Sequence, residues 1–433
     1  MSDLRERIIE DVRAYHREQA PRGEFVPGET EIWPSGAVLD EEDRAALVAA
    51  ALDLRIAGGA LTRRFESRFA KHSDRRKAHL TNSGSSANLL AITALTSHTL
   101  EEPLRPGDEV ITVATGFPTT LNPIIQNGLV PVFVDVDLAT YNTTAERVRA
   151  AIGPRTRAVM MAHTLGNPFP AREIAELAQE HGLYLVEDNC DAVGSTYEGR
   201  LTGTFGDLST VSFYPAHHLA MGEGGCVLTS NLRLARVVES LRDWGRDCWC
   251  EPGENNRCLK RFQYQLGTLP QGYDHKYIFS HVGYNLKATD LQAALGLSQL
   301  RKIDDFCAAR RAAWRRLREG LDGVPHLILP EATPGSDPSW FGFAITVDTD
   351  APFGRPEFVA HLEARGIGTR QLFAGNLTRH PAYADQRYRV VGGLENSDVI
   401  TMQTLWVGVY PGLSDVMLDY VISSITEFVK DRS

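Results

Sequence analysis

Several features common in other protein classes are missing from this chain of 433 residues. No apolar run is long enough to span a membrane, which takes about 20 residues. The first 20 residues are rich in arginine and glutamate and lack the apolar stretch of a signal peptide. The net charge of −10 argues against a general nucleic-acid binder. Lysine is also scarce, at 7 of the 45 basic residues. These absences predict a cytoplasmic protein with neither membrane nor nucleic-acid partners.

What is present predicts a globular enzyme of two or three domains. Hydrophobic residues make up 43% of the chain and charged residues 23%, as in ordinary soluble proteins. Short apolar runs alternate with helical stretches, which is typical of an open, mainly parallel α/β sheet. We expect strands at 79–83, 109–114, 130–136, 158–163, 183–187, 210–214 and 225–229. The expected domains are an N-terminal arm (1–45), a large domain (46–305) with an inserted cysteine-rich loop (244–280), and a smaller C-terminal α/β domain (306–433).

A candidate phosphate site lies at residues 81–88 (TNSGSSAN), which follow an expected strand and open a helix. Exposed backbone N–H groups at a helix N-terminus, together with the helix dipole, bind phosphate. Gly84, Ser85 and Ser86 are therefore candidate cofactor-binding residues. The alternative is a tight turn with a helix cap and no ligand.

Two further strand ends carry residues suited to a planar ring cofactor. Asp188 and Asp191 end the strand at 183–187, and a carboxylate there can pair with a protonated pyridine nitrogen. Phe117 follows the strand at 109–114 and could stack on the same ring. The alternatives are a surface turn with acidic residues and a core phenylalanine.

The run at 212–225 (SFYPAHHLAMGEGG) contains two adjacent histidines. An imidazole moves protons near neutral pH, so His217 is a candidate base and His218 a second one. The alternative is a hydrogen-bonded interior histidine. The run resembles the cofactor segment of the DegT/DnrJ/StrS sugar aminotransferase family, enzymes of PLP fold-type I. In most of that family a lysine stands at the position of His217 and binds the cofactor covalently, which histidine cannot do.

The resemblance implies roles for other residues. It implies that Ser212 binds the cofactor phosphate, Asp188 pairs with the pyridine nitrogen, and Asp191 contacts the ring hydroxyl. Residues 283–290 (GYNLKATD) resemble the family segment that reaches the neighbouring subunit's site. Asn285 is therefore expected to contact the phosphate across a homodimer. The alternative for this run is the N-terminal turn of a helix.

Four cysteines form the second strong pattern. Cys190, Cys248, Cys250 and Cys258 are spaced Cys-x57-Cys-x-Cys-x7-Cys. Four thiolates suit a [2Fe–2S] cluster or a structural zinc, but zinc sites usually place two to four residues between paired cysteines. We therefore expect an iron–sulfur cluster close to the cofactor, with scattered free thiols as the alternative. The other two cysteines are expected to be packing residues.

Two arginines in the last third of the chain are candidate substrate ligands. Arg370 and Arg379 could each bind a diphosphate through paired hydrogen bonds, or form surface ion pairs instead. We assign both, with His218, to the substrate side of the site.

The histidine at the lysine position and the cysteine spacing together resemble one subgroup, the nucleotidyl-hexulose 3-dehydrases, across residues 35–430. This resemblance implies pyridoxamine phosphate (PMP), held without a covalent bond, that condenses with the C4 ketone of a nucleotide-linked 4-keto-6-deoxyhexose. His217 then moves the proton and the C3 hydroxyl leaves. The [2Fe–2S] cluster would relay electrons from a separate NAD(P)H-dependent flavin/iron–sulfur reductase.

The sequence leaves open both the substrate and the class of protein. The excess of arginine over lysine favours a dTDP-4-keto-2,6-dideoxyhexose of an antibiotic sugar pathway as the substrate, with CDP-4-keto-6-deoxyglucose as the next choice. The alternatives are an iron-free PMP- and glutamate-dependent 3-dehydratase, a sugar aminotransferase, and a non-catalytic scaffold relative. The cysteines argue against the first of these and the missing lysine against the second.

Overall fold

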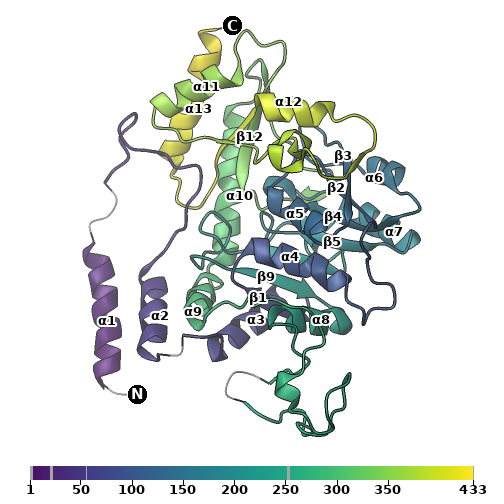
Figure 1. Ribbon diagram of the computed structural model, residues 1–433. Helices are drawn as coiled ribbons and strands as arrows, with labels where there is room; N and C mark the ends of the chain where they lie inside the picture. Colours follow the sequence, from purple (N-terminus) through teal and green to yellow (C-terminus); the bar gives the residue numbers. More distant parts are fainter. Residues whose placement is uncertain (1–2, 20–22, 55, 251–253, 433) are drawn as a thin grey trace.

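The computed structural model describes residues 3–19, 23–54, 56–250 and 254–432 (Figure 1). The helices are α1 (Asp3–Glu18), α2 (Glu41–Leu52), α3 (Ala60–His72), α4 (Gly84–Leu95), α5 (Pro118–Gln126), α6 (Ala145–Ala151), α7 (Ala171–Glu180), α8 (Leu232–Arg242), α9 (Asp290–Gln299), α10 (Ile303–Gly320), α11 (Arg355–Ala364), α12 (Glu395–Gln403) and α13 (Asp415–Lys430). The strands are β1 (Lys77–Thr81), β2 (Glu109–Val113), β3 (Val130–Val134), β4 (Thr156–Ala162), β5 (Tyr184–Asp188), β6 (Thr196–Tyr197), β7 (Arg200–Leu201), β8 (Leu208–Ser212), β9 (Gly225–Thr229), β10 (Leu327–Ile328), β11 (Ser336–Asp337), β12 (Gly342–Val347), β13 (Arg370–Gln371), β14 (Arg389–Val390) and β15 (Thr404–Gly408).

An eight-stranded sheet forms the centre, in the order β1-β9-β8-β5-β4-β2-β3-β14. Strand β9 is antiparallel to both of its neighbours, and the other pairs are parallel. Along β2, Val110 and Ile111 belong to the cores on opposite faces. Burial on both faces explains why these strands read as continuous apolar runs. The expected mainly parallel α/β sheet is confirmed, and each of the seven expected strands overlaps an observed one.

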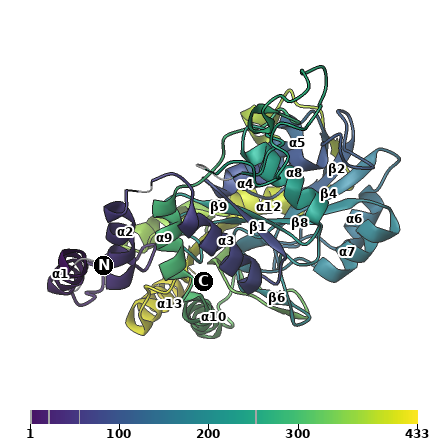
Figure 2. The ribbon, with the colours of Figure 1, turned by 90° about the horizontal axis from the view of Figure 1, so that it is seen from below.

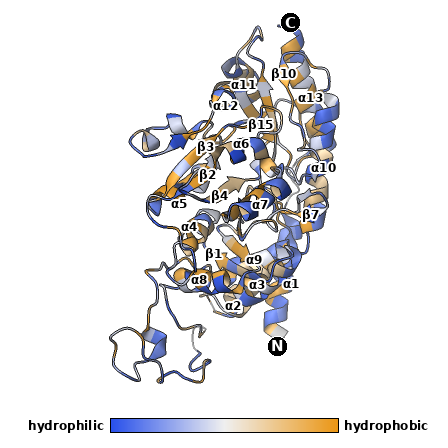
Figure 3. Cartoon of the chain, turned by 90° about the vertical axis from the view of Figure 1, so that its right-hand side faces the viewer, coloured by the Kyte–Doolittle hydropathy of each residue, from blue (hydrophilic) through white to orange (hydrophobic). Residues whose placement is uncertain are grey.

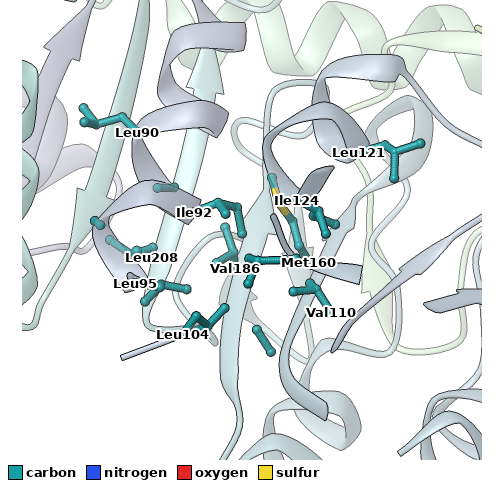
Figure 4. Packing of buried hydrophobic residues seen from close by; sticks show 14 of the residues in the cluster. Leu90, Ile92, Leu95, Leu104, Val110, Leu121, Ile124, Met160, Val186 and Leu208 are labelled. Carbon is teal, nitrogen blue, oxygen red and sulfur yellow. The ribbon is translucent and has the colours of Figure 1, made fainter. Parts of the chain in front are cut away.

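Helices cover both faces of this sheet. On one face α4, α5 and α8 bury a large apolar core. Figure 4 shows Ile92 of α4 beside Val186 of β5, and Ile124 of α5 beside Met160 of β4. The opposite face is covered by α6 and α7, and by α3 and α9 nearer the β1 edge. The N-terminal helix α1 packs on α2, and α2 packs on α9 (Figures 1 and 2).

A smaller antiparallel sheet follows, in the order β10-β12-β15-β13. Helices α10, α11 and α13 pack against it around a third core. Two short strands of this C-terminal region pair outside this sheet: β14 joins the edge of the central sheet beside β3, and β11 pairs with β6. The boundaries expected at 45/46 and 305/306 stay predictions.

The cysteine-rich segment between α8 and α9 extends away from the central sheet (Figures 1 and 3). Its described part is irregular apart from a short 3-10 turn at His275–Tyr277. The strands of two residues are not predictable from the sequence, because so short a run carries no period to detect. No helix in the described ranges combines the length and the apolarity needed to cross a bilayer.

Candidate active site

A cavity of about 590 Å³ opens where several parallel strands of the central sheet end. Ligands bind at this edge in open α/β sheets, because helix N-termini and strand ends converge there. The cavity gathers nine of the sequence-predicted residues, which are Gly84, Ser85, Phe117, Asp188, Cys190, Asp191, Ser212, His217 and Arg370.

Asp188 lies at the end of β5 and is held by residues of two helices. Its Oδ2 accepts hydrogen bonds from Asn88 Nδ2 at 2.8 Å and from Thr120 Oγ1 at 2.7 Å. Its Oδ1 accepts from the backbone N–H of Cys190 at 3.2 Å. Asn88 is itself fixed, because Thr210 donates to its Oδ1 at 2.5 Å. These bonds fix the orientation of a buried carboxylate at the edge of the cavity.

The N-terminus of α4 approaches the end of β8 very closely. Ser83 caps the helix, and its Oγ accepts from the backbone N–H of Ser86 at 3.1 Å. A Cβ atom on Gly84 would lie 2.5 Å from Cβ of Ser212, so a larger residue does not fit. The exposed N–H groups of this turn and the Ser212 hydroxyl therefore lie together, as a phosphate site requires.

His217 lies on the irregular segment after β8, inside the cavity. Its Nδ1 is 3.5 Å from Asp191 Oδ1 and makes no hydrogen bond. Its ring lies 5.1 Å from the ring of Phe341, centroid to centroid. Burial and the nearby charge of Arg310 lower the pKa of His217 to about 3. The imidazole is therefore neutral at physiological pH, and so low a pKa makes it a weak base.

Asp191 has the opposite shift. Burial and the neighbouring charge of Asp188 raise the pKa of Asp191 to about 8. At neutral pH its carboxyl group is therefore mostly protonated and can donate a hydrogen bond. The two carboxyl groups of the predicted cofactor site thus differ in their environments. Asp188 accepts hydrogen bonds from three donors, whereas burial and the charge of Asp188 favour the neutral form of Asp191.

Arg310 of α10 lies behind the segment that carries His217. Its side chain is fully buried and donates to the backbone carbonyls of Trp340 at 3.2 Å, Ala216 at 3.3 Å and His217 at 3.1 Å. Burial lowers the pKa of Arg310 to about 10, so it remains charged. A buried cation bonded to carbonyls fixes the backbone around His217.

Aromatic side chains form one wall of the cavity. Phe117 precedes α5 and is 51% exposed, and its ring meets Phe373 edge to face at 5.9 Å. Phe341 and Trp406 line the same wall. Phe117 is therefore not a core residue, and its stacking on a planar ring stays a prediction.

Four of the predicted cofactor- and substrate-binding residues lie outside the cavity lining. Ser86 serves the helix cap, where its hydroxyl accepts a hydrogen bond from Ser83 Oγ at 3.0 Å. His218 is buried and bonds the carbonyl of Ser339 at 2.8 Å, so it is an interior histidine. Arg379 forms an ion pair with Asp398, which is the surface alternative foreseen for it.

Asn285 is exposed and lies beside Asp243 in an isolated bridge. Thr289 caps α9, so the alternative for this run also holds: it is the N-terminal turn of a helix. An exposed Asn285 outside its own cavity is compatible with a contact to a neighbouring subunit, which stays a prediction.

The four predicted metal ligands are divided between two places. Cys190 lies in the cavity, where burial and the charges of Asp188 and Asp191 raise the pKa of its thiol. Cys248, Cys250 and Cys258 lie in the projecting loop and interact with one another. In the described ranges of this single chain, no three His, Cys, Asp or Glu side chains converge on a point that could hold a metal. Cys226 and Cys307 are buried, as expected of packing residues.

Asn88, Thr120 and Arg310 were not among the residues predicted for the site. Asn88 stands inside the motif at 81–88 and Thr120 follows Phe117 by three residues, and their positions near the N-termini of α4 and α5 were the available signal. No sequence signal points to Arg310, which lies 93 residues after His217.

Comparisons with known proteins identify relatives of this chain and solved structures that resemble it. The chain is 69% identical over 432 residues to dTDP-4-dehydro-2,6-dideoxy-D-glucose 3-dehydratase of Saccharopolyspora spinosa, covering 100% of this chain and 93% of the relative. It is 52% identical to the lipopolysaccharide biosynthesis protein RfbH of Salmonella typhimurium, covering 99% and 98%. The structure superposes on E. coli GDP-4-keto-6-deoxy-D-mannose-3-dehydratase with bound hydrated PLP at a TM-score of 0.82 and 28% identity, covering 92% and 100%.

These likenesses confirm the expected fold, which is PLP fold-type I. The sequence profile of the DegT/DnrJ/EryC1/StrS aminotransferase family matches residues 38–426, nearly the whole chain. This protein therefore belongs to the DegT/DnrJ/EryC1/StrS aminotransferase family.

Proposed function

We propose that this protein is a PMP-dependent 3-dehydratase that removes the C3 hydroxyl of a nucleotide-linked 4-keto-6-deoxyhexose. The observation that carries the proposal is His217 at the lysine position, inside the cavity that holds Asp188. Among the described residues that line this cavity there is no lysine. Amino transfer needs that lysine to hold the cofactor, so the site favours proton transfer instead. Two relatives named as sugar 3-dehydratases support a dehydratase over an aminotransferase.

The residues present fit a phosphorylated pyridine cofactor. The α4 N-terminus and Ser212 would offer hydrogen-bond donors to a phosphate, and the missing Cβ of Gly84 lets the two approach each other closely. Asp188, oriented by its two side-chain partners, would hold a proton on the ring nitrogen. Bound there, PMP supplies an amine for the sugar carbonyl and a ring that takes up electron density.

The chain's own groups supply the proton transfer. His217 lines the cavity, and in this proposal its imidazole takes a proton from carbon and returns one to the leaving hydroxyl. Arg310 fixes the backbone of this residue and limits the range of ring positions. The aromatic wall excludes water from the reacting face.

The proposed substrate is a dTDP-4-keto-2,6-dideoxyhexose, with CDP-4-keto-6-deoxyglucose as second choice. The support is the name of the relative that is 69% identical. Arg370 lies on the cavity lining and would bind the diphosphate. A homodimer is part of the proposal, because Asn285 is exposed outside its own cavity.

The proposal includes a [2Fe–2S] cluster on the four predicted cysteines and a separate NAD(P)H-dependent reductase that reduces it. The cysteine spacing is its support. The arrangement within one chain does not fit a four-thiolate cluster, because Cys190 lies in the cavity and the other three lie in the loop. No electron-transfer step is therefore derived from this geometry. An iron-free dehydratase is the second candidate.

The test uses the exchange of a C4′ hydrogen of PMP with D2O in the presence of the dTDP-linked substrate, measured by mass spectrometry. His217→Asn should bind PMP within about threefold of wild type and lose exchange by about 100- to 10,000-fold, the range of a general base. His181→Asn, at the end of α7, is the matched control and should exchange normally. Exchange at the wild-type rate in His217→Asn would refute the role of this residue.

A further inference from the structure

A second cavity, of about 860 Å³, lies at the edge of the central sheet. Strand β1 is the edge strand, and α3 and α8 pack on it from opposite faces of the sheet (Figure 1). Residues of α3, β1 and α8 supply most of the lining of this edge cavity. Among the described residues, none lines both this cavity and the candidate active site. Its volume is in the range of about 300–1,000 Å³ that is typical of small-molecule sites.

Side chains already occupy outward backbone groups of β1. The N–H of Leu80 donates to Glu66 Oε1 at 2.8 Å, and its carbonyl accepts from Arg242 Nη1 at 2.9 Å. An edge strand whose outward groups are free is a template for another strand. The bonds at Leu80 oppose such pairing, so the edge cavity is suited to a small molecule that side chains bind.

Positive charge dominates the lining of the edge cavity. Eight of the described lining residues are lysine or arginine, and three are aspartate or glutamate. Two of the three carboxylates are paired within the lining: Glu66 lies 2.6 Å from Arg242, and Glu239 lies 3.6 Å from Arg236. The third is Asp74. The cavity therefore carries more positive charge than its own carboxylates offset, which favours a ligand with several negative charges.

Three of these cations stand close together in the sequence. Lys71 lies near the end of α3, Lys77 begins β1, and Arg76 precedes it. All three are exposed, and in the described part of the chain no carboxylate lies within ion-pair distance of their side chains. Arg75 differs, because it donates to the backbone carbonyls of Gly203 at 2.6 Å and of residue 206 at 2.8 Å. Lys71, Arg76 and Lys77 are thus available to an anion.

His79 adds a buried polar group to the same lining. It is 7% exposed, and its Nε2 has no hydrogen-bond partner among the described residues. Burial, with the charges of Arg242 and Lys77 close by, lowers the pKa of His79 well below its usual range, so its imidazole is neutral. A buried polar atom without a partner costs free energy. A ligand that bonds this nitrogen would remove that cost.

We propose that the edge cavity binds a small molecule with a diphosphate group, at a site separate from the candidate active site. Ammonium and guanidinium groups bind phosphate oxygens, and a diphosphate supplies the several negative charges that the lining favours. His79 Nε2 would bond one further polar atom of the ligand. Inorganic diphosphate and a nucleoside diphosphate share this chemistry, and the volume admits either. The proposal does not depend on the PMP reaction.

Isothermal titration calorimetry tests the proposal with inorganic diphosphate and with dTDP as separate ligands. The protein is PMP-loaded and carries Arg370→Gln, which weakens the diphosphate contact proposed for the other cavity. Lys71→Gln/Lys77→Gln should raise the Kd at least tenfold, because it removes two charged contacts. Arg157→Gln/Lys430→Gln is the matched control, since it changes the net charge equally at two exposed residues outside the lining, and should change the Kd less than twofold.

The outcomes distinguish the two ligands and the two cavities. A lower Kd for dTDP than for inorganic diphosphate would show that the site also binds the nucleoside, whereas equal values would assign recognition to the diphosphate alone. A Kd that Lys71→Gln/Lys77→Gln leaves unchanged would overturn the proposal, because the ligand then binds elsewhere. Equal losses in both double variants would overturn it as well, since they indicate general charge attraction. So would the absence of binding by either ligand at 1 mM, roughly the weak end of specific affinities.

Lysine protection gives a second measurement on wild-type protein, where no variant has to fold. Brief acetylation followed by peptide mass spectrometry reports the reactivity of each amine. Saturating diphosphate should lower the acetylation of Lys71 and Lys77 at least threefold and leave Lys430 unchanged. Equal acetylation of Lys71 and Lys77 with and without the ligand would overturn the proposal. His79→Phe keeps a ring but removes Nε2, and it should raise the Kd by about two- to tenfold.

Discussion

Replacing Thr120 with valine should weaken PMP binding although Thr120 is not predicted to touch the cofactor ring nitrogen. The change keeps the volume of the side chain but removes one of the two side-chain donors to Oδ2 of Asp188, at 2.7 Å. A hydrogen bond to a charged group contributes about 1.5–3 kcal/mol. If the whole loss appeared in binding, the Kd would rise by roughly 10- to 150-fold, at 1.4 kcal/mol per factor of ten.

The same bond exists in the cofactor-free protein, so part of this energy appears in stability instead. We expect the Kd for PMP, measured by equilibrium dialysis, to rise about tenfold, and the free energy of unfolding of the apoprotein to fall by about 1 kcal/mol. Thr143→Val is the matched control, because Thr143 is buried, its hydroxyl has no hydrogen-bond partner and it lies outside the cavity lining.

A double-mutant cycle with Asp188→Asn tests whether Thr120 affects PMP binding through the Asp188 carboxylate. If Thr120 acts through the Asp188 carboxylate, Thr120→Val should cost much less in the Asp188→Asn background than in wild type. A Kd within twofold of wild type for the single variant would refute the reasoning. Additive effects in the cycle would refute it as well.

The other predictions concern the phosphate turn, the two arginines and acid stability. Gly84→Ala should lower the free energy of unfolding by about 1–3 kcal/mol in urea titrations, because its Cβ would meet Ser212 at 2.5 Å; no change would mean that the turn can open. Arg370→Gln should raise the KM for the nucleotide sugar by about tenfold, whereas the paired Arg379→Gln should change it less than twofold; equal effects would contradict the assignment. Because the pKa of His217 falls from 6.5 to about 3 on folding, its contribution to stability is present above pH 6.5 and is lost as the pH falls toward 3. The free energy of unfolding should therefore change less steeply with pH in His217→Asn than in wild type, by about 1.4 kcal/mol per pH unit between pH 5.5 and 4.5. An unchanged pH dependence would refute the lowered pKa.

The sheet and most of the site could be predicted because the physics involved is local. Strands buried on both faces read as apolar runs, and their ends meet at one edge of a parallel sheet. Gly84, Phe117, Asp188 and Ser212 each stand at or just after such a strand end. Their convergence in one cavity follows from the topology alone.

The rest depended on contacts between distant parts of the chain. Arg370 and Arg379 look alike in the sequence, and only the fold gives one to the cavity and the other to Asp398. His218 stands beside His217, but it turns to a backbone carbonyl in the interior. The cysteine spacing predicts a ligand set but contains no information on where the loop lies. These differences arise from tertiary placement, which no local period or spacing encodes.

The bonds of Arg310 limit how this enzyme can open. The helix that carries this guanidinium belongs to the layer packed on the smaller sheet, while two of its three carbonyl partners lie on the segment after β8 of the central sheet. A hinge rotation between the two sheets would strip a desolvated cation of these partners. Entry and exit of the proposed nucleotide sugar should therefore rely on movements of the surface loops, with the two sheets moving as one rigid body around the imidazole of His217.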